Sequence, residues 1–162
     1  HPADLAVADE KDVEEVIHPL GFYHTKARHA IECAQTILAD WNGHVPDTME
    51  GLTSLPGIGR KTANIVLNKA FGKVEGIAVD THVFRIATRL GFTAAPTPLA
   101  AEQDLLSIIP QSLWGSVNET WIQLGREICS SRAPKCDICP LADLCPSAGS
   151  ALRSPAKGIR KK

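Results

Sequence analysis

The sequence has no surplus of basic residues, because 17 Lys and Arg face 18 Asp and Glu and the formal net charge is −1. Proteins that bind nucleic acid nonspecifically usually depend on such a surplus, so the overall charge does not point to a DNA partner. The chain also lacks an apolar run long enough to cross a membrane, and it lacks a recognisable signal peptide. These absences predict a soluble protein with no membrane partner.

Strand signals are also missing, since no segment alternates apolar and polar residues over the length of a strand and no internal repeat is visible. Apolar residues instead recur at helical spacing in one segment after another. The expected helices cover residues 10–17, 25–41, 60–72, 80–91, 97–110 and 117–128, and a further helix follows Asp47, its expected N-cap. With 162 residues and 44% hydrophobic residues, the chain can bury a core. The predicted fold class is all-α.

Residues 55–61, Leu-Pro-Gly-Ile-Gly-Arg-Lys, are the stretch that the other helices are expected to support. Glycine adopts positive φ at little cost and lets backbone N–H groups approach a ligand, so Gly57 and Gly59 predict a tight turn that can hold an anion. The next helix opens at Arg60 or Lys61, and its positive dipole end and free N–H groups suit a phosphate. Taken alone, the pattern fits an ordinary helix–helix connection with a solvated lysine equally well.

Four of the five cysteines lie in one short window, at Cys129, Cys136, Cys139 and Cys145, separated by six, two and five residues. This crowding favours a metal centre over disulfides. An iron–sulfur cluster fits the spacing better than zinc, because paired structural zinc sites usually have two close Cys-x-x-Cys couples and only one is present. Zinc stays as the alternative. Cys33 is expected to be an ordinary buried thiol.

Three motifs in order carry a resemblance to a known family: the run LPGIGRKTANIVLNKAFG from Leu55, the VDTH element at residues 79–82, and the Cys-x6-Cys-x2-Cys-x5-Cys loop. Together they resemble endonuclease III, the helix-hairpin-helix DNA glycosylase and AP lyase of base-excision repair. The resemblance implies a helical barrel module followed by a C-terminal loop that binds a [4Fe–4S] cluster. It also implies a monomer in the bacterial cytoplasm that acts on double-stranded DNA with a damaged pyrimidine or an abasic site. An upstream targeting signal stays open, because the chain begins at His1.

The resemblance also assigns catalytic residues, since Lys61 corresponds by position to the family's nucleophile and Asp80 to its catalytic aspartate. It implies that a damaged pyrimidine is flipped out of the duplex and that the Lys61 amine displaces it at C1′. The resulting Schiff base would then nick the strand by β-elimination. Because lysine with a pKa of about 10.4 is almost wholly charged at pH 7, Asp80 is expected to accept its proton or to stabilise charge on the sugar. The plainer interpretations are that Lys61 contacts phosphate and that Asp80 caps its helix, a role compatible with catalysis.

Other residues are expected to contact DNA through the same resemblance. Leu20 and Phe22 align with the family's intercalating loop and would wedge into the gap left by the flipped base, with burial in the core as the alternative. His82 either orients pocket groups or is a structural histidine. The cluster is expected to be chiefly structural, holding a loop whose basic residues touch phosphates. The predicted DNA-contacting residues are Leu20, Phe22, Leu55, Gly57, Ile58, Gly59, Arg60, His82, Arg132 and Lys135.

The expected domains are a helical module over residues 1–112, a C-terminal helix with the cysteine loop over 113–146, and a basic tail over 147–162. The tail is expected to be disordered rather than a dedicated DNA-binding arm. Family members have helices upstream of His1, so the apolar faces that these helices cover are expected to be exposed, at a cost to cluster retention and base extrusion. Two alternatives to a bifunctional glycosylase remain: a monofunctional mismatch glycosylase and a noncatalytic DNA-binding module.

Overall fold

The computed structural model describes residues 1–149, and all of their regular secondary structure is helical. The chain divides into two compact units, His1–Glu75 and Gly76–Lys162, of which the second is described as far as Gly149. The helical secondary structure confirms the all-α prediction. No helix within the described residues is long and apolar enough to cross a membrane. The basic residues of the predicted tail, from Arg153 onward, lie outside the described part of the chain.

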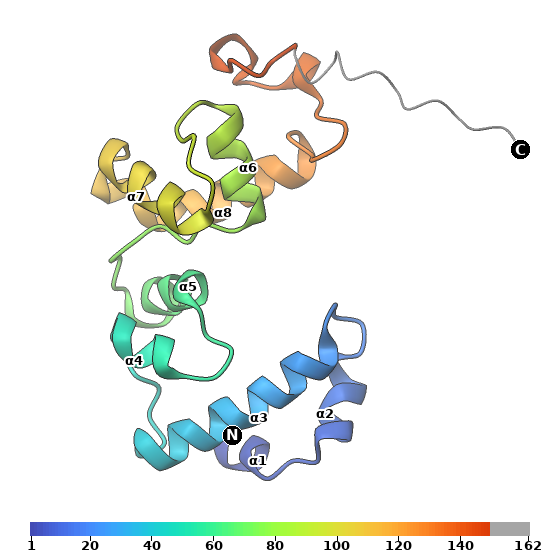
Figure 1. The fold of residues 1–162 in the computed structure, drawn as a ribbon, viewed down its shortest axis with the longest axis vertical. Helices are drawn as coiled ribbons and strands as arrows, with labels where there is room; N and C mark the ends of the chain where they lie inside the picture. Colours follow the sequence, from blue (N-terminus) through green and yellow to red (C-terminus); the bar gives the residue numbers. More distant parts are fainter. Residues whose placement is uncertain (150–162) are drawn as a thin grey trace, which may run out of the picture. The chain divides into compact units, whose positions relative to one another are not determined.

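The first unit is built around one long helix that carries a pair of shorter ones. Its helices are α1 (Pro2–Ala6), α2 (Glu10–Ile17), α3 (Tyr23–Asp40), α4 (Met49–Ser54) and α5 (Arg60–Phe71). Helices α1 and α2 pack on α3, and α4 packs on α5 (Figure 1). One buried cluster joins α3, α4 and α5, and it consists of Ile37, Leu52, Leu55, Ala63 and Leu67. The core therefore fixes the connection between α4 and α5, which is the predicted hairpin.

Helix α3 begins at Tyr23, two residues before the predicted start at Thr25. The residue before it, Phe22, has left-handed backbone geometry with φ 59°, which is uncommon for a residue with a side chain. Cys33, farther along α3, packs half-buried against the core of the first unit, and burial raises the pKa of its thiol. The thiol is therefore partly buried, which is less than the fully buried thiol that the sequence predicted.

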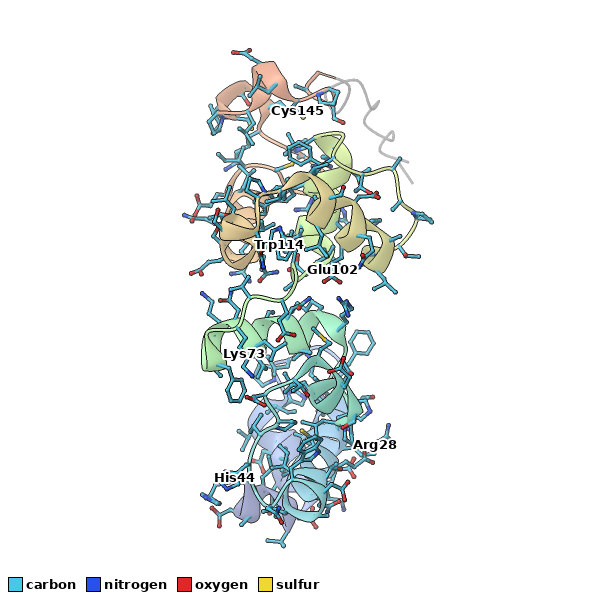
Figure 2. All side chains as sticks on the ribbon, turned by 90° about the vertical axis from the view of Figure 1, so that its left-hand side faces the viewer. Arg28, His44, Lys73, Glu102, Trp114 and Cys145 are labelled. Atoms are coloured by element: carbon cyan, nitrogen blue, oxygen red, sulfur yellow. The ribbon has the colours of Figure 1, made fainter. Side chains whose placement is uncertain are left out.

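Helix α4 is capped by Thr48, so the prediction that Asp47 caps it was wrong. The Thr48 hydroxyl oxygen accepts a hydrogen bond from the Gly51 N–H at 3.1 Å. The Asp47 carboxylate instead accepts a hydrogen bond from Lys73, with Nζ 2.6 Å from Oδ2 and 2.8 Å from the Asp47 carbonyl oxygen. Lys73 follows the end of α5 (Figure 2). A full positive charge therefore holds the carboxylate away from the helix amides.

The second unit packs one short helix against two others and then continues into the cysteine loop. Its elements are α6 (Thr81–Arg89), α7 (Pro98–Ile108), η1 (Gln111–Leu113), α8 (Trp114–Glu127), η2 (Cys136–Ile138) and η3 (Ala142–Leu144). Helix α6 packs against both α7 and α8. The buried core consists of Ile77, Val79, Val83, Ala87, Leu105 and Val117, with Trp114 at its edge (Figure 2). This core packs α6 and α7 against the first half of α8, and the cysteine loop follows the other end of α8.

Candidate nucleic-acid interface and metal centre

The hairpin between α4 and α5 is closed by a hydrogen bond from the Ile58 N–H to the Leu55 carbonyl oxygen at 3.1 Å. Gly57 has φ +75°, and a Cβ built on it would lie 2.8 Å from His29 of α3, so the turn itself requires glycine. Gly59 has φ −91°, and a Cβ there would meet none of the described atoms within 4 Å. The fold therefore does not demand glycine at Gly59, and the missing side chain leaves the backbone open to a ligand.

Helix α5 starts directly after this turn without a side-chain cap. Its N-cap is Gly59, which makes no side-chain hydrogen bond, so no side chain at the cap satisfies the first-turn N–H groups. Arg60 and Lys61 take the first two helical positions, and Lys61 is exposed, whereas Ala63 and Leu67 are buried. An uncapped helix start, an open glycine and two cations together suit a phosphate group.

Asp80 is the N-cap of α6, which confirms the plainer of its two predicted roles. Its Oδ1 accepts hydrogen bonds from the backbone N–H groups of His82 at 2.9 Å and Val83 at 2.8 Å. Both of these hydrogen bonds go to Oδ1, and within the described residues Oδ2 accepts none. One carboxylate oxygen therefore fixes the side chain, and the other is available for chemistry.

Lys61 belongs to the first unit and Asp80 to the second, and each is placed within its own unit. The expectation that Asp80 accepts the proton of the Lys61 amine therefore stays a prediction. Each residue nevertheless lies at the first turn of a helix that its own core holds in place. Both side chains are thus carried on rigid elements, which is what a catalytic pair requires.

The turn between α2 and α3 presents the two predicted wedge residues to solvent. Phe22 is 87% exposed and Leu20 is 50% exposed, so the interpretation of both as core residues was wrong. On either side of the turn, the His24 ring nitrogen Nδ1 lies 2.7 Å from Glu14 Oε1, which ties the start of α3 to α2. The left-handed backbone at Phe22 thus places an aromatic ring at the tip of a braced turn.

His82 is held against α8 by Arg85, a residue that the motif analysis missed. Arg85 Nη2 lies 3.2 Å from His82 Nδ1 and donates to the carbonyl oxygens of Gly125 at 3.2 Å and Cys129 at 2.9 Å. A Cβ on Gly125 would lie 2.6 Å from His82 Nδ1, so the imidazole packs directly on the α8 backbone. These contacts support the structural interpretation of His82. The available signal was the position of Arg85, three residues after His82 on the same helix face.

The four predicted cysteine ligands are all free thiols and line one pocket in the loop after α8. Within residues 1–149, no three His, Cys, Asp or Glu side chains come close enough together to hold a single metal ion. Four cysteines and no histidine line this pocket, and four thiolates are a donor set by which proteins hold an iron–sulfur cluster. The residues present therefore fit such a cluster.

The two basic residues predicted to contact DNA from this loop, Arg132 and Lys135, are both exposed. Lys135 also lines the cysteine pocket. Its backbone N–H donates to the Ile128 carbonyl oxygen at 3.0 Å and so closes the loop onto the end of α8. Their contact with phosphates stays a prediction.

Comparisons with known proteins match both regions of the chain. A model of the HhH-GPD superfamily of base excision DNA repair proteins matches residues 1–111, and a model of the iron–sulfur binding domain of endonuclease III matches residues 129–145. Endonuclease III from Thermotoga maritima is 42% identical over 144 residues, which cover 89% of this chain and 67% of that protein. The chain belongs to the endonuclease III family. This membership confirms the predicted family and the [4Fe–4S] cofactor over the zinc alternative.

Other family members set the extent of the match. Endonuclease III from Synechocystis sp. is 46% identical over 144 residues, and the chain spans 66% of the length of that relative. A solved structure of a trapped endonuclease III–DNA covalent intermediate matches with a TM-score of 0.87 and 38% identity, over 94% of this chain and 71% of that one. A thermostable thymine-DNA glycosylase, at 24% identity and a TM-score of 0.78, shares the fold alone. The helix-hairpin-helix glycosylase fold is thereby confirmed.

Proposed function

We propose that this endonuclease III family chain removes damaged pyrimidines from duplex DNA and nicks the resulting abasic site through a lysine Schiff base. The observation that carries the proposal is the start of α5, where exposed Lys61 follows the open turn at Gly59 on a helix without a side-chain cap. A turn that can grip a phosphate next to a primary amine brings a DNA strand to a nucleophile. The relative trapped as a covalent intermediate with DNA supports the same chemistry.

DNA is held by the hairpin and opened by the turn between α2 and α3. Backbone N–H groups of Gly57 and Gly59, with the positive end of α5 and Arg60, bind one phosphate. The exposed Phe22 ring fills the gap that the flipped nucleotide leaves, with Leu20 beside it. Because the Glu14–His24 contact braces this turn, the ring enters the duplex without first having to be ordered.

Base removal and strand cleavage use the Lys61 amine and the Asp80 carboxylate. Neutral Lys61 attacks C1′ of the flipped nucleoside, a C–N bond forms, and the bond to the base breaks, with its electron pair leaving on the base. Asp80 Oδ2 takes the amine proton or stabilises the positive charge on the sugar, while Oδ1 keeps the α6 cap. Sugar ring opening gives the Schiff base. Loss of a C2′ proton then breaks the C3′–O bond, and water releases Lys61.

Four thiolates would hold the iron–sulfur cluster, namely those of Cys129, Cys136, Cys139 and Cys145, and the bound cluster would stabilise the loop that follows α8. No catalytic step passes through it. The loop presents Arg132 and Lys135, which add phosphate contacts beyond those of the hairpin.

Borohydride reduction on an oligonucleotide with one abasic site tests the proposal. The parent chain should give a covalent DNA adduct, and Lys61→Gln should give none while still binding DNA. Lys69→Gln, the same change at the other end of α5, is the matched control and should trap like the parent. An adduct that survives in Lys61→Gln would remove Lys61 from the mechanism. Binding without an adduct in the parent would favour a noncatalytic module or a monofunctional glycosylase.

A further inference from the structure

Arg89, the last residue of α6, contacts both ends of the run of cysteines. Its Nη1 donates to Cys129 Sγ at 3.2 Å and to the Ser130 carbonyl oxygen at 2.7 Å, and its Nη2 donates to the Ser131 carbonyl oxygen at 2.9 Å. Its own carbonyl oxygen lies 3.5 Å from Cys145 Sγ. One arginine therefore reaches the first and the last ligand of the cluster loop.

We propose that Arg89 is a positioning residue for the cluster, which fixes the Cys129 thiolate and tunes the reduction potential of the cluster. As a ligand Cys129 carries negative charge, so its hydrogen bond from the guanidinium becomes charge-assisted and stronger. The Cys145 contact behaves in the opposite way, because a thiolate has no proton to donate to the Arg89 carbonyl oxygen. Cluster binding therefore strengthens the hold of Arg89 on Cys129 and removes its hydrogen bond with Cys145.

The guanidinium makes this role specific to arginine. Its planar fork bridges the Cys129 sulfur and the two following carbonyl oxygens at once, whereas the ammonium of lysine is a single point charge. Hydrogen bonds and positive charge at a ligand sulfur withdraw electron density and favour the more negative, reduced cluster. Losing Arg89 should therefore lower the reduction potential as well as loosen the cluster.

Arg85 offers a contrast on the same helix face. It donates to the Cys129 carbonyl oxygen from Nε at 3.1 Å and from Nη2 at 2.9 Å, and no contact between Arg85 and a cysteine sulfur is recorded in residues 1–149. Arg85 thus holds the backbone at the start of the loop, and Arg89 holds the ligand atom itself. The two arginines separate support of the loop from direct tuning of the cluster.

The test compares purified, cluster-loaded 162-residue chains carrying Arg89→Met, Arg89→Lys or Arg126→Met. Arg126→Met is the matched control, because Arg126 is exposed in the last turn of α8. Iron and sulfide content, the rate at which the visible cluster absorbance is lost to a chelator, and the reduction potential are measured for each. Arg89→Met should lose its cluster about 10- to 100-fold faster than the parent and show a lower potential. Arg89→Lys should fall between them, and Arg126→Met should match the parent.

Three results would overturn the proposal. One is an Arg89→Met protein with the cluster loss rate and potential of the parent. Another is faster cluster loss with an unchanged potential, because that result assigns Arg89 to loop packing alone. If Arg89→Met retains no cluster, the Arg89→Lys protein is used for the comparison instead. A cluster loss rate and a reduction potential equal to those of the parent in Arg89→Lys would show that the guanidinium fork has no role.

Discussion

Helices α5 and α6 both begin at residues assigned to chemistry, yet they satisfy their first-turn amides in opposite ways. Helix α6 is capped from within the chain, since Asp80 Oδ1 accepts two backbone hydrogen bonds at 2.9 and 2.8 Å. Helix α5 has Gly59 as its N-cap, with no side-chain hydrogen bond and open space at its Cα. One helix start is capped by a side chain of the protein, and the other has no side-chain cap.

This difference separates a positioning task from a binding task. A capped start immobilises the residue that caps it, so the free oxygen of Asp80 points in a fixed direction and is preorganised for charge stabilisation. A start without a side-chain cap offers no side-chain acceptor at the cap position, so an anion that arrives there can take that place. Changes at Asp80 should therefore affect catalysis and stability separately, and changes at Gly59 should affect DNA binding before stability.

The largest effect on activity is expected from Asp80→Asn, because this change removes the carboxylate charge and keeps a side chain that can cap α6. Asparagine caps a helix about as well as aspartate, so the free energy of unfolding should stay close to that of the parent. The carboxylate is lost, and the single-turnover rate of base removal and strand cleavage should fall about 10²- to 10⁴-fold. Rapid-quench cleavage assays and urea unfolding measure the two quantities on the same sample.

Asp80→Ala serves as the control for this division. It should lose the same activity and in addition about 1 kcal/mol of stability, since Oδ1 no longer accepts from the amides of His82 and Val83. A parental cleavage rate in Asp80→Asn would limit Asp80 to capping. Equal stability of the alanine and asparagine variants would show that the cap contributes nothing.

A smaller effect is expected from alanine at the two hairpin glycines, and the two variants should differ in kind. Gly57→Ala puts a Cβ at φ +75° and 2.8 Å from His29, so it should cost roughly 1–2 kcal/mol or more in unfolding free energy. Gly59→Ala meets no such contact and should unfold like the parent, yet its methyl group obstructs the phosphate and should weaken binding to abasic DNA. Urea unfolding and DNA titration at fixed salt compare them. Loss of stability in Gly59→Ala with intact binding would contradict the contrast.

Most of the fold could be predicted because its signals are local. Each of these signals involves residues only a few positions apart in the sequence. Examples are apolar residues at helical spacing and helix caps such as Asp80 and Thr97. The failure at α4 shows the limit of local signals. Asp47 and Thr48 are both good N-cap residues, and the choice between them depends on Lys73, which lies 26 positions from Asp47 and binds its carboxylate.

The residues of the candidate site also differ in whether local sequence signals reveal them. The hairpin and the cysteine ligands were predictable because each motif is contiguous or nearly so. The contacts of Arg85 and Arg89 with Cys129 were not, because Cys129 lies 44 and 40 positions away from them and only the packing of α6 on α8 brings them together. The exposure of Phe22 also depends on a feature that composition does not encode, the left-handed backbone before α3.

The smallest expected effect concerns the Asp47–Lys73 pair, which joins the residues just before α4 to those just after α5. The hydrogen bond from Lys73 and its positive charge lower the pKa of Asp47 below its ordinary value. A carboxyl group with a lowered folded-state pKa adds stability above its unfolded pKa of about 3.9, and this contribution is lost as the pH falls through the folded value. Asp47→Asn should therefore lower the melting temperature slightly at pH 5–7, and the gap should close below about pH 3.9.

The Lys73→Met background decides whether this gap belongs to the pair. Both side chains are partly solvent-exposed, at 54% for Asp47 and 40% for Lys73, so water and salt screen the pair and its contribution is small. Without Lys73, Asp47→Asn should leave the melting temperature unchanged across the same pH range. A gap that persists in Lys73→Met, or one that widens as the pH falls, would assign the effect to another partner of Asp47. The loop before α4 would then be anchored by something other than the end of α5.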